Sequence, residues 1–239
     1  MERIAKTIAN NGYCSRRKAE ELISKKKVRV NGEVINEPGT LVSPNDIIEV
    51  EGNILEKNEK VYILLNKPRG VVSTTTDDKN RKTVLDLINI KVRVYPIGRL
   101  DYDTTGVLLL TNDGELTNKL LHPSSKIEKV YIAKIKGIPT KGHINTLESG
   151  IIIDGKKTAR SKVKIKKIDK KTNTSVISVT VHEGRNHQIK DMFKSLGYEV
   201  VKLRRERIGF LTAEGLKIGE YRYLNIKEVK VLYNLVNSK

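Results

Sequence analysis

The chain has 239 residues and a mass of 27.0 kDa, which allows one large domain or a main domain with a small module. Hydrophobic residues make up 38% and charged residues 31%, so the composition permits a folded core and excludes a protein built from membrane spans. With 46 Lys and Arg against 28 Asp and Glu, the formal net charge is +18, which makes a polyanion such as nucleic acid the first partner to expect.

The first thirty residues predict two short helices. Apolar residues recur at helical spacing over 4–9, and Gly12 is a natural stop after them. Ser15 is suited to cap a second helix, whose apolar residues share one face. The first turn of this second helix carries three cations: Arg16, Arg17 and Lys18. Because these charges oppose the helix dipole, we expect an external anion to offset them.

The residues that follow predict a β-hairpin. Val28-Arg29-Val30 alternates as a strand, Asn31-Gly32 is typical of a type I′ turn, and Val34-Ile35 continues as the return strand. Residues 1–30 contain nine Lys and Arg against three Glu, whereas residues 31–52 contain five acids and no cation. The positive charge of this segment is therefore concentrated in its helical half.

The run SRRKAEELI at 15–23, followed by VRVNG at 28–32, resembles the S4 RNA-binding domain. In that family the basic helix and the hairpin bind RNA. The resemblance thus implies that Arg16, Arg17 and Lys18 contact RNA, where the alternative is a merely solvated helix face. The family usually ends this helix on a glycine near the position of Lys26, so we expect a local difference at the helix exit.

The remainder of the chain predicts an α+β domain. The polar segment EVEGNILEKNEK at 49–60 favours a boundary, which divides the chain into domains 1–56 and 57–239. Strands are expected at 61–65, 71–74, 107–111, 130–135, 175–181 and 199–203. Helices are expected at 115–121, 186–196 and 226–236. Because their spacing is too irregular for βαβ units, we expect a largely antiparallel mixed sheet with a central cleft.

Several common sites are absent from the sequence. It contains no phosphate-binding P-loop, no dinucleotide-binding glycine pattern and no G-x-S-x-G nucleophile elbow. His182 and His187 are five residues apart with Gly184 between them, a poor spacing for zinc ligands on a helix. Cys14 is the single cysteine, which excludes an intrachain disulfide and a cysteine-rich zinc cluster. We therefore expect no metal site at these residues.

Neither a secretory leader nor a spanning helix is expected. The opening residues MERIAKTIANNGYC mix charged and short apolar stretches, and no window approaches the ~18 uninterrupted apolar residues of a transmembrane helix. A single cysteine also suits a reducing compartment. We therefore expect a cytoplasmic protein without a membrane partner.

The segment GRLDYDTTGVLLLTNDG at 98–114 joins a polar turn to a buried strand. Taken alone, Asp101 in such a turn favours an ordinary Asx turn over a catalytic role. The whole run, however, resembles the signature of the ribosomal RNA pseudouridine synthases that carry an N-terminal S4 domain. Further motifs of this family are matched by NKPRG at 66–70, KVY at 129–131 and GRNHQIK at 184–190. The resemblance covers nearly the full chain and is closest to the B-type enzymes of the large ribosomal subunit.

The resemblance implies isomerisation of uridine to pseudouridine without metal or cofactor. By motif, Asp101 is the catalytic carboxylate, and it acts either as a nucleophile or as the base of an elimination. Lys190 is its ion-pair partner, which would keep the carboxylate charged against desolvation. Tyr131 stacks on the uracil or accepts a proton, where the alternative is a strand residue packed in the core.

The resemblance also assigns residues that contact RNA. A stacked uridine must be turned out of its helix before a carboxylate can reach it. Arg99 is expected to insert or to hold the displaced strand, where the alternative is an ion pair with Asp103. Arg185 and Lys67 are expected to contact phosphates.

The expected function is modification of 23S large-subunit ribosomal RNA. Two alternatives stay open at this point: the 16S small-subunit RNA as target, and a non-catalytic ribosome assembly factor. The expected partner is ribosomal RNA or a ribosomal subunit precursor, and the expected oligomeric state is a monomer.

Overall fold

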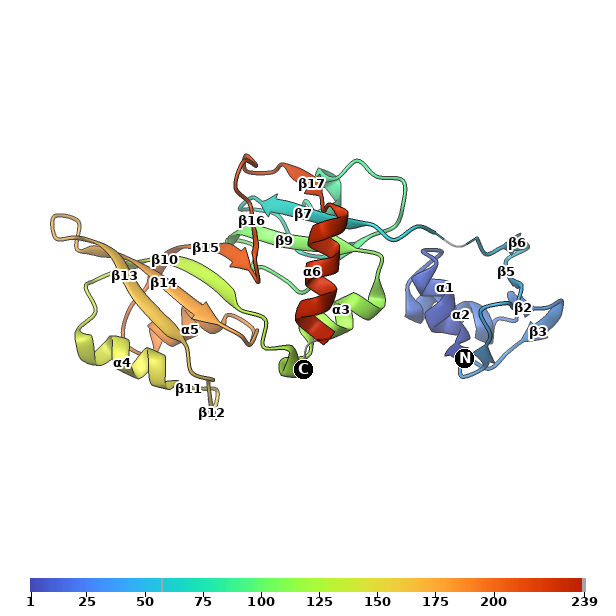
Figure 1. The fold of residues 1–239 in the computed structure, drawn as a ribbon, viewed down its shortest axis with the longest axis horizontal. Helices are drawn as coiled ribbons and strands as arrows, with labels where there is room; N and C mark the ends of the chain where they lie inside the picture. Colours follow the sequence, from blue (N-terminus) through green and yellow to red (C-terminus); the bar gives the residue numbers. More distant parts are fainter. Residues whose placement is uncertain (57, 238–239) are drawn as a thin grey trace. The chain divides into compact units, whose positions relative to one another are not determined.

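The computed structural model describes residues 1–56 and 58–237 (Figure 1). Its contacts divide the chain into two compact units. The first comprises Met1–Tyr62, Ile90–Tyr95 and Thr111–Gly114, and the second comprises Ile63–Asn89, Pro96–Leu110 and Glu115–Lys239.

The first unit contains two helices and a small antiparallel sheet. The helices are α1 (Ile4–Asn10) and α2 (Arg16–Ser24). The sheet has the order β3-β2-β5-β6, made of β2 (Val28–Val30), β3 (Glu33–Ile35), β5 (Ile48–Val50) and β6 (Asn53–Ile54). A separate pair joins β1 (Glu2–Arg3) to β4 (Leu41–Val42). Helices and sheet share a core of small and branched apolar side chains, including the fully buried Ile4, Ile8, Ile23, Val28 and Val50.

The predicted cap and turn of this unit are confirmed. Ser15 accepts the backbone N–H of Lys18 at 3.2 Å, which starts α2. Asn31 and Gly32 have φ values of 51° and 88°, as a type I′ turn requires. Lys26, two residues after α2, has φ 58°, the left-handed conformation that glycine adopts most readily, so the helix exit keeps a glycine-type backbone with a lysine in it rather than the local difference that was expected.

The second unit is built on a nine-stranded mixed sheet with the order β13-β14-β10-β15-β9-β7-β17. The strands are β7 (Tyr62–Lys67), β9 (Thr105–Thr111), β10 (Lys129–Lys136), β13 (Lys162–Asp169), β14 (Thr174–Val181), β15 (Val200–Ile208) and β17 (Tyr221–Tyr223), with β8 (Tyr95–Pro96) paired to β9 and β16 (Leu211–Thr212) paired to β15. β9 and β15 pair in parallel, whereas β10, β13 and β14 pair antiparallel. The expected α+β fold with a largely antiparallel mixed sheet is confirmed.

Helices and short segments complete the second unit. They are α3 (Gly114–Leu121), α4 (Lys141–Ser149), α5 (Gln188–Lys194), α6 (Ile226–Asn237), the 3₁₀ turns η1 (Leu85–Leu87) and η2 (Pro123–Ser125), and the hairpin of β11 (Ile152–Ile153) and β12 (Lys156–Lys157). One face of β10, β14 and β15 packs against α4 and α5, with Phe193 and Met192 of α5 almost fully buried. None of the described helices is long and apolar enough to cross a membrane.

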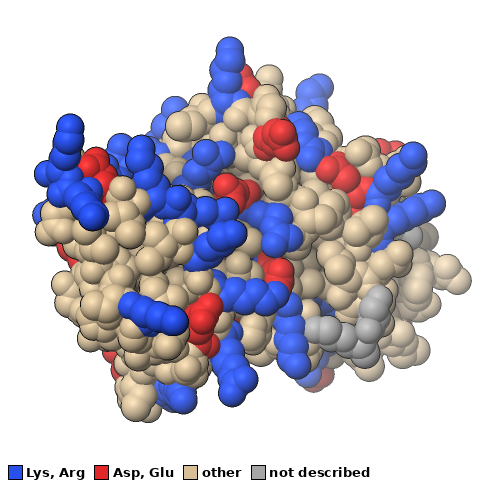
Figure 2. Space-filling view, turned by 60° about the vertical axis from the view of Figure 1, so that its left-hand side comes forward, with Lys and Arg blue, Asp and Glu red and all other residues tan. Residues whose placement is uncertain are grey.

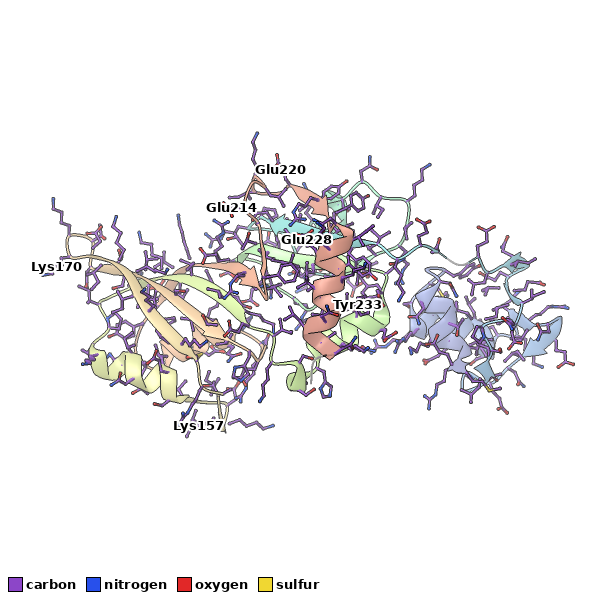
Figure 3. All side chains as sticks on the ribbon, in the orientation of Figure 1. Lys157, Lys170, Glu214, Glu220, Glu228 and Tyr233 are labelled. Carbon is purple, nitrogen blue, oxygen red and sulfur yellow. The ribbon has the colours of Figure 1, made fainter. Side chains whose placement is uncertain are left out.

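Two local expectations are wrong. Residues 71–74 form no strand and contribute only a bridge between Val72 and Thr83. The helix expected at 186–196 begins at Gln188, because His187 has the left-handed φ of 49°. The sequence analysis also missed β13 and α4. β13 alternates Val163 and Ile165 with lysines and ends at a hairpin whose tip carries Lys170 (Figure 3). Figure 2 shows Lys and Arg spread over the face that it presents, with fewer Asp and Glu between them.

The close approach of β9 and β15 depends on a glycine. Gly106 pairs with Arg205 and has a φ of 107°. A Cβ at this position would lie 2.1 Å from the backbone oxygen of Arg205, far inside van der Waals contact. Glycine therefore allows the strand that follows Asp101 to reach the strand that carries Arg205.

Candidate active site

Asp101 lies in the loop between the buried Leu100 and strand β9. Lys67, at the end of β7, fixes this loop: its Nζ donates to the carbonyl oxygens of Pro68 at 3.1 Å, Asp101 at 3.0 Å and Thr104 at 3.0 Å. The three hydrogens of the ammonium group thus each have an acceptor. Burial lowers the pKa of Lys67 to about 8, although the negative charges of the neighbouring aspartates oppose this shift.

The position of Lys67 corrects one prediction. Its side chain is fully buried (0% exposed) and its ammonium group is used by the backbone. It is therefore not available to contact a phosphate of RNA. Its motif contains a buried structural lysine beside the loop of Asp101, and the run of buried apolar residues before it in β7 was the signal for burial.

Lys190 of α5 bridges two carboxylates. Its Nζ lies 2.9 Å from Oδ2 of Asp101 and 2.6 Å from Oδ1 of Asp103. Burial alone would lower the pKa of Lys190, but the two carboxylates raise it above its ordinary value. Burial alone would likewise raise the pKa of Asp103, and Lys190 lowers it. The expected pairing of Lys190 with Asp101 is present. The alternative pair of Arg99 with Asp103 is absent among the described residues, because Lys190 takes that place.

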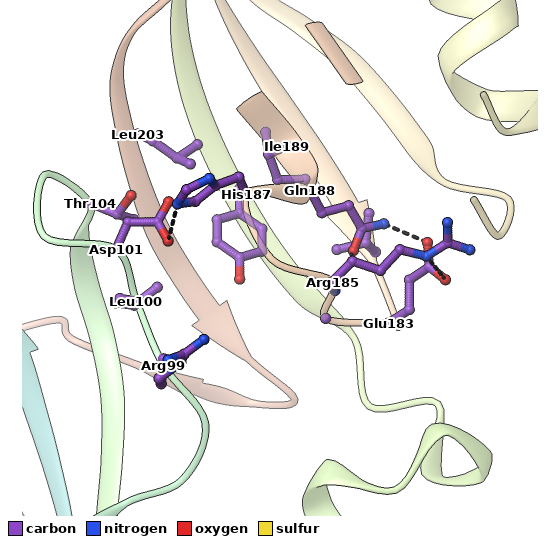
Figure 4. Close-up of a pocket in the computed structure, with 13 residues that line it drawn as sticks. Arg99, Leu100, Asp101, Thr104, Glu183, Arg185, His187, Gln188, Ile189 and Leu203 are labelled. Carbon is purple, nitrogen blue, oxygen red and sulfur yellow. Dashed lines mark hydrogen bonds and ion pairs between the residues drawn. The ribbon is translucent and has the colours of Figure 1, made fainter. Parts of the chain in front are cut away.

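His187 also faces the carboxylate, although the sequence analysis considered it only as a metal ligand. Its Nε2 lies 3.6 Å from Oδ1 of Asp101, and Figure 4 shows the two side chains directed at one another. The left-handed backbone of His187 immediately before α5 turns its ring toward the loop. Among the described residues, no group of three His, Cys, Asp or Glu side chains could bind a metal.

Tyr131 of β10 lies opposite Arg205 of β15 in the sheet register. Arg205 is 4% exposed; its Nε donates to the carbonyl of Val107 at 2.8 Å and its Nη1 to the hydroxyl of Tyr131 at 3.3 Å. Its guanidinium carbon is 6.0 Å from the centre of the Tyr131 ring, a cation–π distance. Arg205 was not among the residues predicted from the sequence, where its only signal is that an arginine occupies an inward position of a strand.

The remaining predicted residues lie in two regions. Arg99 and Arg185 line the cavity that contains Asp101 and Tyr131 (Figure 4). Arg185 donates to the carbonyls of Lys156 at 2.9 Å and Lys157 at 2.5 Å, and lies 3.5 Å from Glu183. The cations of the first unit are exposed on the first turn of α2: Arg16, Arg17 and Lys18.

Two cavities meet at Asp101. A narrow one, about 50 Å³, lies between Asp101, Tyr131 and Leu203. A wider one of about 560 Å³ extends from Asp101 past Tyr102 and Thr74. The wider volume lies in the range of pockets that bind small molecules or single nucleotides. Together they form a cleft with an aspartate, its partner cation and an aromatic ring at its floor.

Comparison with known proteins agrees with this geometry. The family model for RNA pseudouridylate synthase matches residues 61–195, and the S4 domain model matches residues 2–48. The chain is 54% identical to ribosomal large subunit pseudouridine synthase B of Bacillus subtilis (strain 168), over 99% of this chain and 98% of that protein. It is 38% identical to the dual-specificity RNA pseudouridine synthase RluF of Escherichia coli (strain K12), over 99% of this chain and 80% of that protein.

A solved structure has the same fold. The crystal structure of a pseudouridylate synthase superposes with a TM-score of 0.70 at 32% identity, and the match covers 97% of this chain and 100% of that one. The chain therefore belongs to the RNA pseudouridylate synthases, with an S4 domain preceding the family domain.

Proposed function

We propose that this protein converts a uridine of large-subunit ribosomal RNA to pseudouridine and that Asp101 is the catalytic carboxylate. One observation carries the proposal: the Asp101 carboxylate is 25% exposed in a cleft, 2.9 Å from Lys190. The large-subunit target is supported by the name of the B. subtilis relative, which matches almost the whole length of both chains.

The reaction breaks the bond between N1 of uracil and C1′ of ribose, turns the base, and joins C5 to C1′. The hydrogen on C5 leaves as a proton and N1 gains one, so the product is an isomer. Asp101 serves either as a nucleophile toward base or sugar, or as a base that removes a sugar proton. Both routes use the carboxylate form of Asp101, and the ammonium group of Lys190 lies 2.9 Å from it as its ion-pair partner.

Tyr131 is proposed to stack on the uracil or to accept a proton during the rearrangement. Its ring lines the narrow cavity together with Asp101. The hydrogen bond from Arg205 to its hydroxyl fixes the position of the phenol. A held ring offers a flat contact to a base, and its hydroxyl can exchange protons.

The target uridine must leave its stack, at a cost of a few kcal/mol. Arg99 is proposed to occupy the space left by the base or to hold the displaced strand, and Arg185 to contact a phosphate. On the S4 domain, Arg16, Arg17 and Lys18 are proposed to bind RNA through their exposed side chains.

The organisation of the protein belongs to the same proposal. We place the boundary between the S4 domain and the catalytic domain after residue 56, a point supported by its position between the two family matches. The protein is proposed to act as a cytoplasmic monomer whose partner is ribosomal RNA or a ribosomal precursor particle. Sedimentation of the purified protein at several concentrations tests the monomer: a mass above 27.0 kDa that grows with concentration contradicts it.

Release of tritium from RNA labelled at uridine C5 tests the activity. The wild-type protein is expected to release tritium from large-subunit RNA. Asp101→Asn is expected to abolish release while RNA affinity changes little, because phosphate contacts dominate affinity. An inactive wild type would leave the non-catalytic assembly factor as the better assignment, and loss of RNA binding in Asp101→Asn would contradict the role of Asp101.

Carbodiimide primer extension on RNA from cells with and without the protein tests the target. We expect one stop in large-subunit RNA to disappear with the protein. A stop that disappears only from small-subunit RNA would transfer the assignment to the 16S molecule.

A further inference from the structure

A third cavity, about 390 Å³, shares Arg99 and Arg185 with the wide part of the cleft. Apolar side chains line part of it, among them Ile97, Leu109, Leu120 and Ile208. Its charged lining is almost entirely positive: Arg99, Lys129, Arg185 and Arg205. The only carboxylate among the described lining residues, Glu183, is already engaged by the side chain of Gln188 at 2.5 Å and by Arg185.

Two of these cations have no counter-charge in the described part of the chain. Lys129 shares a face of β10 with Tyr131, and its Nζ makes a long contact of 3.4 Å to the carbonyl of Ile127. No carboxylate among the described residues lies within 4.0 Å of Lys129 or Arg205. The Nη2 of Arg205 is buried and lacks a hydrogen-bond acceptor within residues 1–56 and 58–237.

Such an arrangement is unfavourable in the free protein. Burial lowers the pKa of Lys129, and the nearby charge of Arg205 lowers it further. Charges withdrawn from water without a partner destabilise a fold, and natural interiors pair or omit them. An anion in the cavity would supply the missing counter-charge, because Lys129 and Arg205 both line it. Lys129 would contact the anion, and Arg205 would add positive potential beside it.

We propose that Lys129 and Arg205 form an anion site that binds the backbone phosphate of a nucleotide next to the target uridine. The inference rests on the proposed function, because it takes the anion to be the RNA substrate. The cavity shares Arg99, Tyr131 and Arg185 with the narrow cavity at Asp101. A strand whose uracil lies against Tyr131 therefore continues its backbone into the reach of Lys129.

The anion site would help to position the target nucleotide for the reaction. A phosphate bound there fixes the strand on one side of the target nucleotide while Asp101 acts on its base. Binding energy from this remote group would then position the base, and its loss would lower kcat/KM more than overall RNA affinity. Lys129 is accordingly a positioning residue for Asp101 and Tyr131.

A methylphosphonate scan tests the site. Synthetic RNA stem-loops with the target uridine carry one neutral methylphosphonate at each successive phosphate around it. In the wild-type protein, one position is expected to lower kcat/KM about tenfold or more, as loss of one charge-assisted hydrogen bond does. Lys129→Met is expected to lower kcat/KM for unmodified RNA by a similar factor and to abolish the penalty at that one position.

Control variants separate this role from a structural one. Lys134→Met changes a lysine of the same strand on the opposite sheet face, and it is expected to keep the full penalty. Lys129→Arg restores a charge and is expected to regain most of the activity. Thermal unfolding of each variant checks the fold, and the same scan on Lys129→Gln replaces that on Lys129→Met if the methionine variant is unstable.

Two results would overturn the anion site. One is a scan in which no single methylphosphonate lowers wild-type kcat/KM. The other is a methylphosphonate penalty on kcat/KM that stays unchanged in Lys129→Met, which would mean that the Lys129 ammonium group contacts water in the cavity and not the phosphate. Absence of tritium release from every unmodified RNA is a separate result, and it would refute the proposed function.

Discussion

Lys67 is a fully buried positive charge whose three hydrogen bonds join β7 to the loop of Asp101. We expect Lys67→Met to lower the free energy of unfolding by about 3 kcal/mol, because three carbonyls, one of them in a buried hydrogen bond, lose a charged donor. The same change should lower kcat at least tenfold, since the loop no longer fixes Asp101, and leave RNA affinity nearly unchanged. Urea unfolding, tritium release and filter binding measure the three effects. If Lys67→Met instead bound RNA more weakly and kept a normal kcat, Lys67 would have to be assigned as a phosphate contact after all.

The lowered pKa of Lys67 predicts that the stability of the protein depends on pH. Its proton leaves near pH 8 in the folded protein and near 10.5 in the unfolded chain, so the unfolded chain binds more protons between these values. The free energy of unfolding of the wild type, measured relative to Lys67→Met, should therefore rise with pH across this window, by about 3 kcal/mol in total. A difference that is flat from pH 8 to 10.5 would show that the amine titrates normally.

At the scale of elements, Gly106 controls the parallel contact of β9 with β15. Gly106→Ala should destabilise the fold by about 3 kcal/mol or more, because its Cβ meets the backbone of Arg205 and its φ of 107° is strained for alanine. Activity should fall as well, since the two strands position Asp101 and Arg205. Gly215→Ala is the matched control: it also has a positive φ, 77°, but open space around it, so about 1 kcal/mol is expected. Equal effects in urea unfolding would contradict the role of the close approach.

The elements that could be predicted well from the sequence are those that depend on residues close together in the chain. The cap at Ser15 and the turn at Asn31-Gly32 depend only on neighbouring residues. β13 and Arg205 depend on partners far along the chain. The many lysines of β13 hide its strand pattern, and the strand forms by pairing with β14. Arg205 can be buried because Val107 and Tyr131 accept its hydrogen bonds. Motif resemblance identified the position of Lys67 but gave no indication of its burial.

For the whole molecule, the +18 net charge implies binding that weakens steeply with salt. The exposed cations of α2 should contribute a defined part of this dependence. We expect the triple change Arg16→Gln, Arg17→Gln and Lys18→Gln to reduce the slope of log K against log salt by up to about 2, at ~0.7 for each single-strand phosphate that is no longer bound. Affinity for ribosomal RNA should fall, while kcat at saturating RNA stays within about twofold because the catalytic cleft is unaltered.

The comparison variant removes the same charge elsewhere. Lys217→Gln, Lys227→Gln and Lys230→Gln neutralise three exposed lysines on and before α6. If net charge alone attracts RNA, both triple variants will lower affinity and slope equally. If α2 contacts the phosphates, only its variant will lose slope, since counterion release requires contact rather than distant charge. Equal slopes in the α2 variant and the wild type would mean that these three side chains face solvent in the complex, and the RNA-binding surface of the S4 domain would have to be sought on its hairpin.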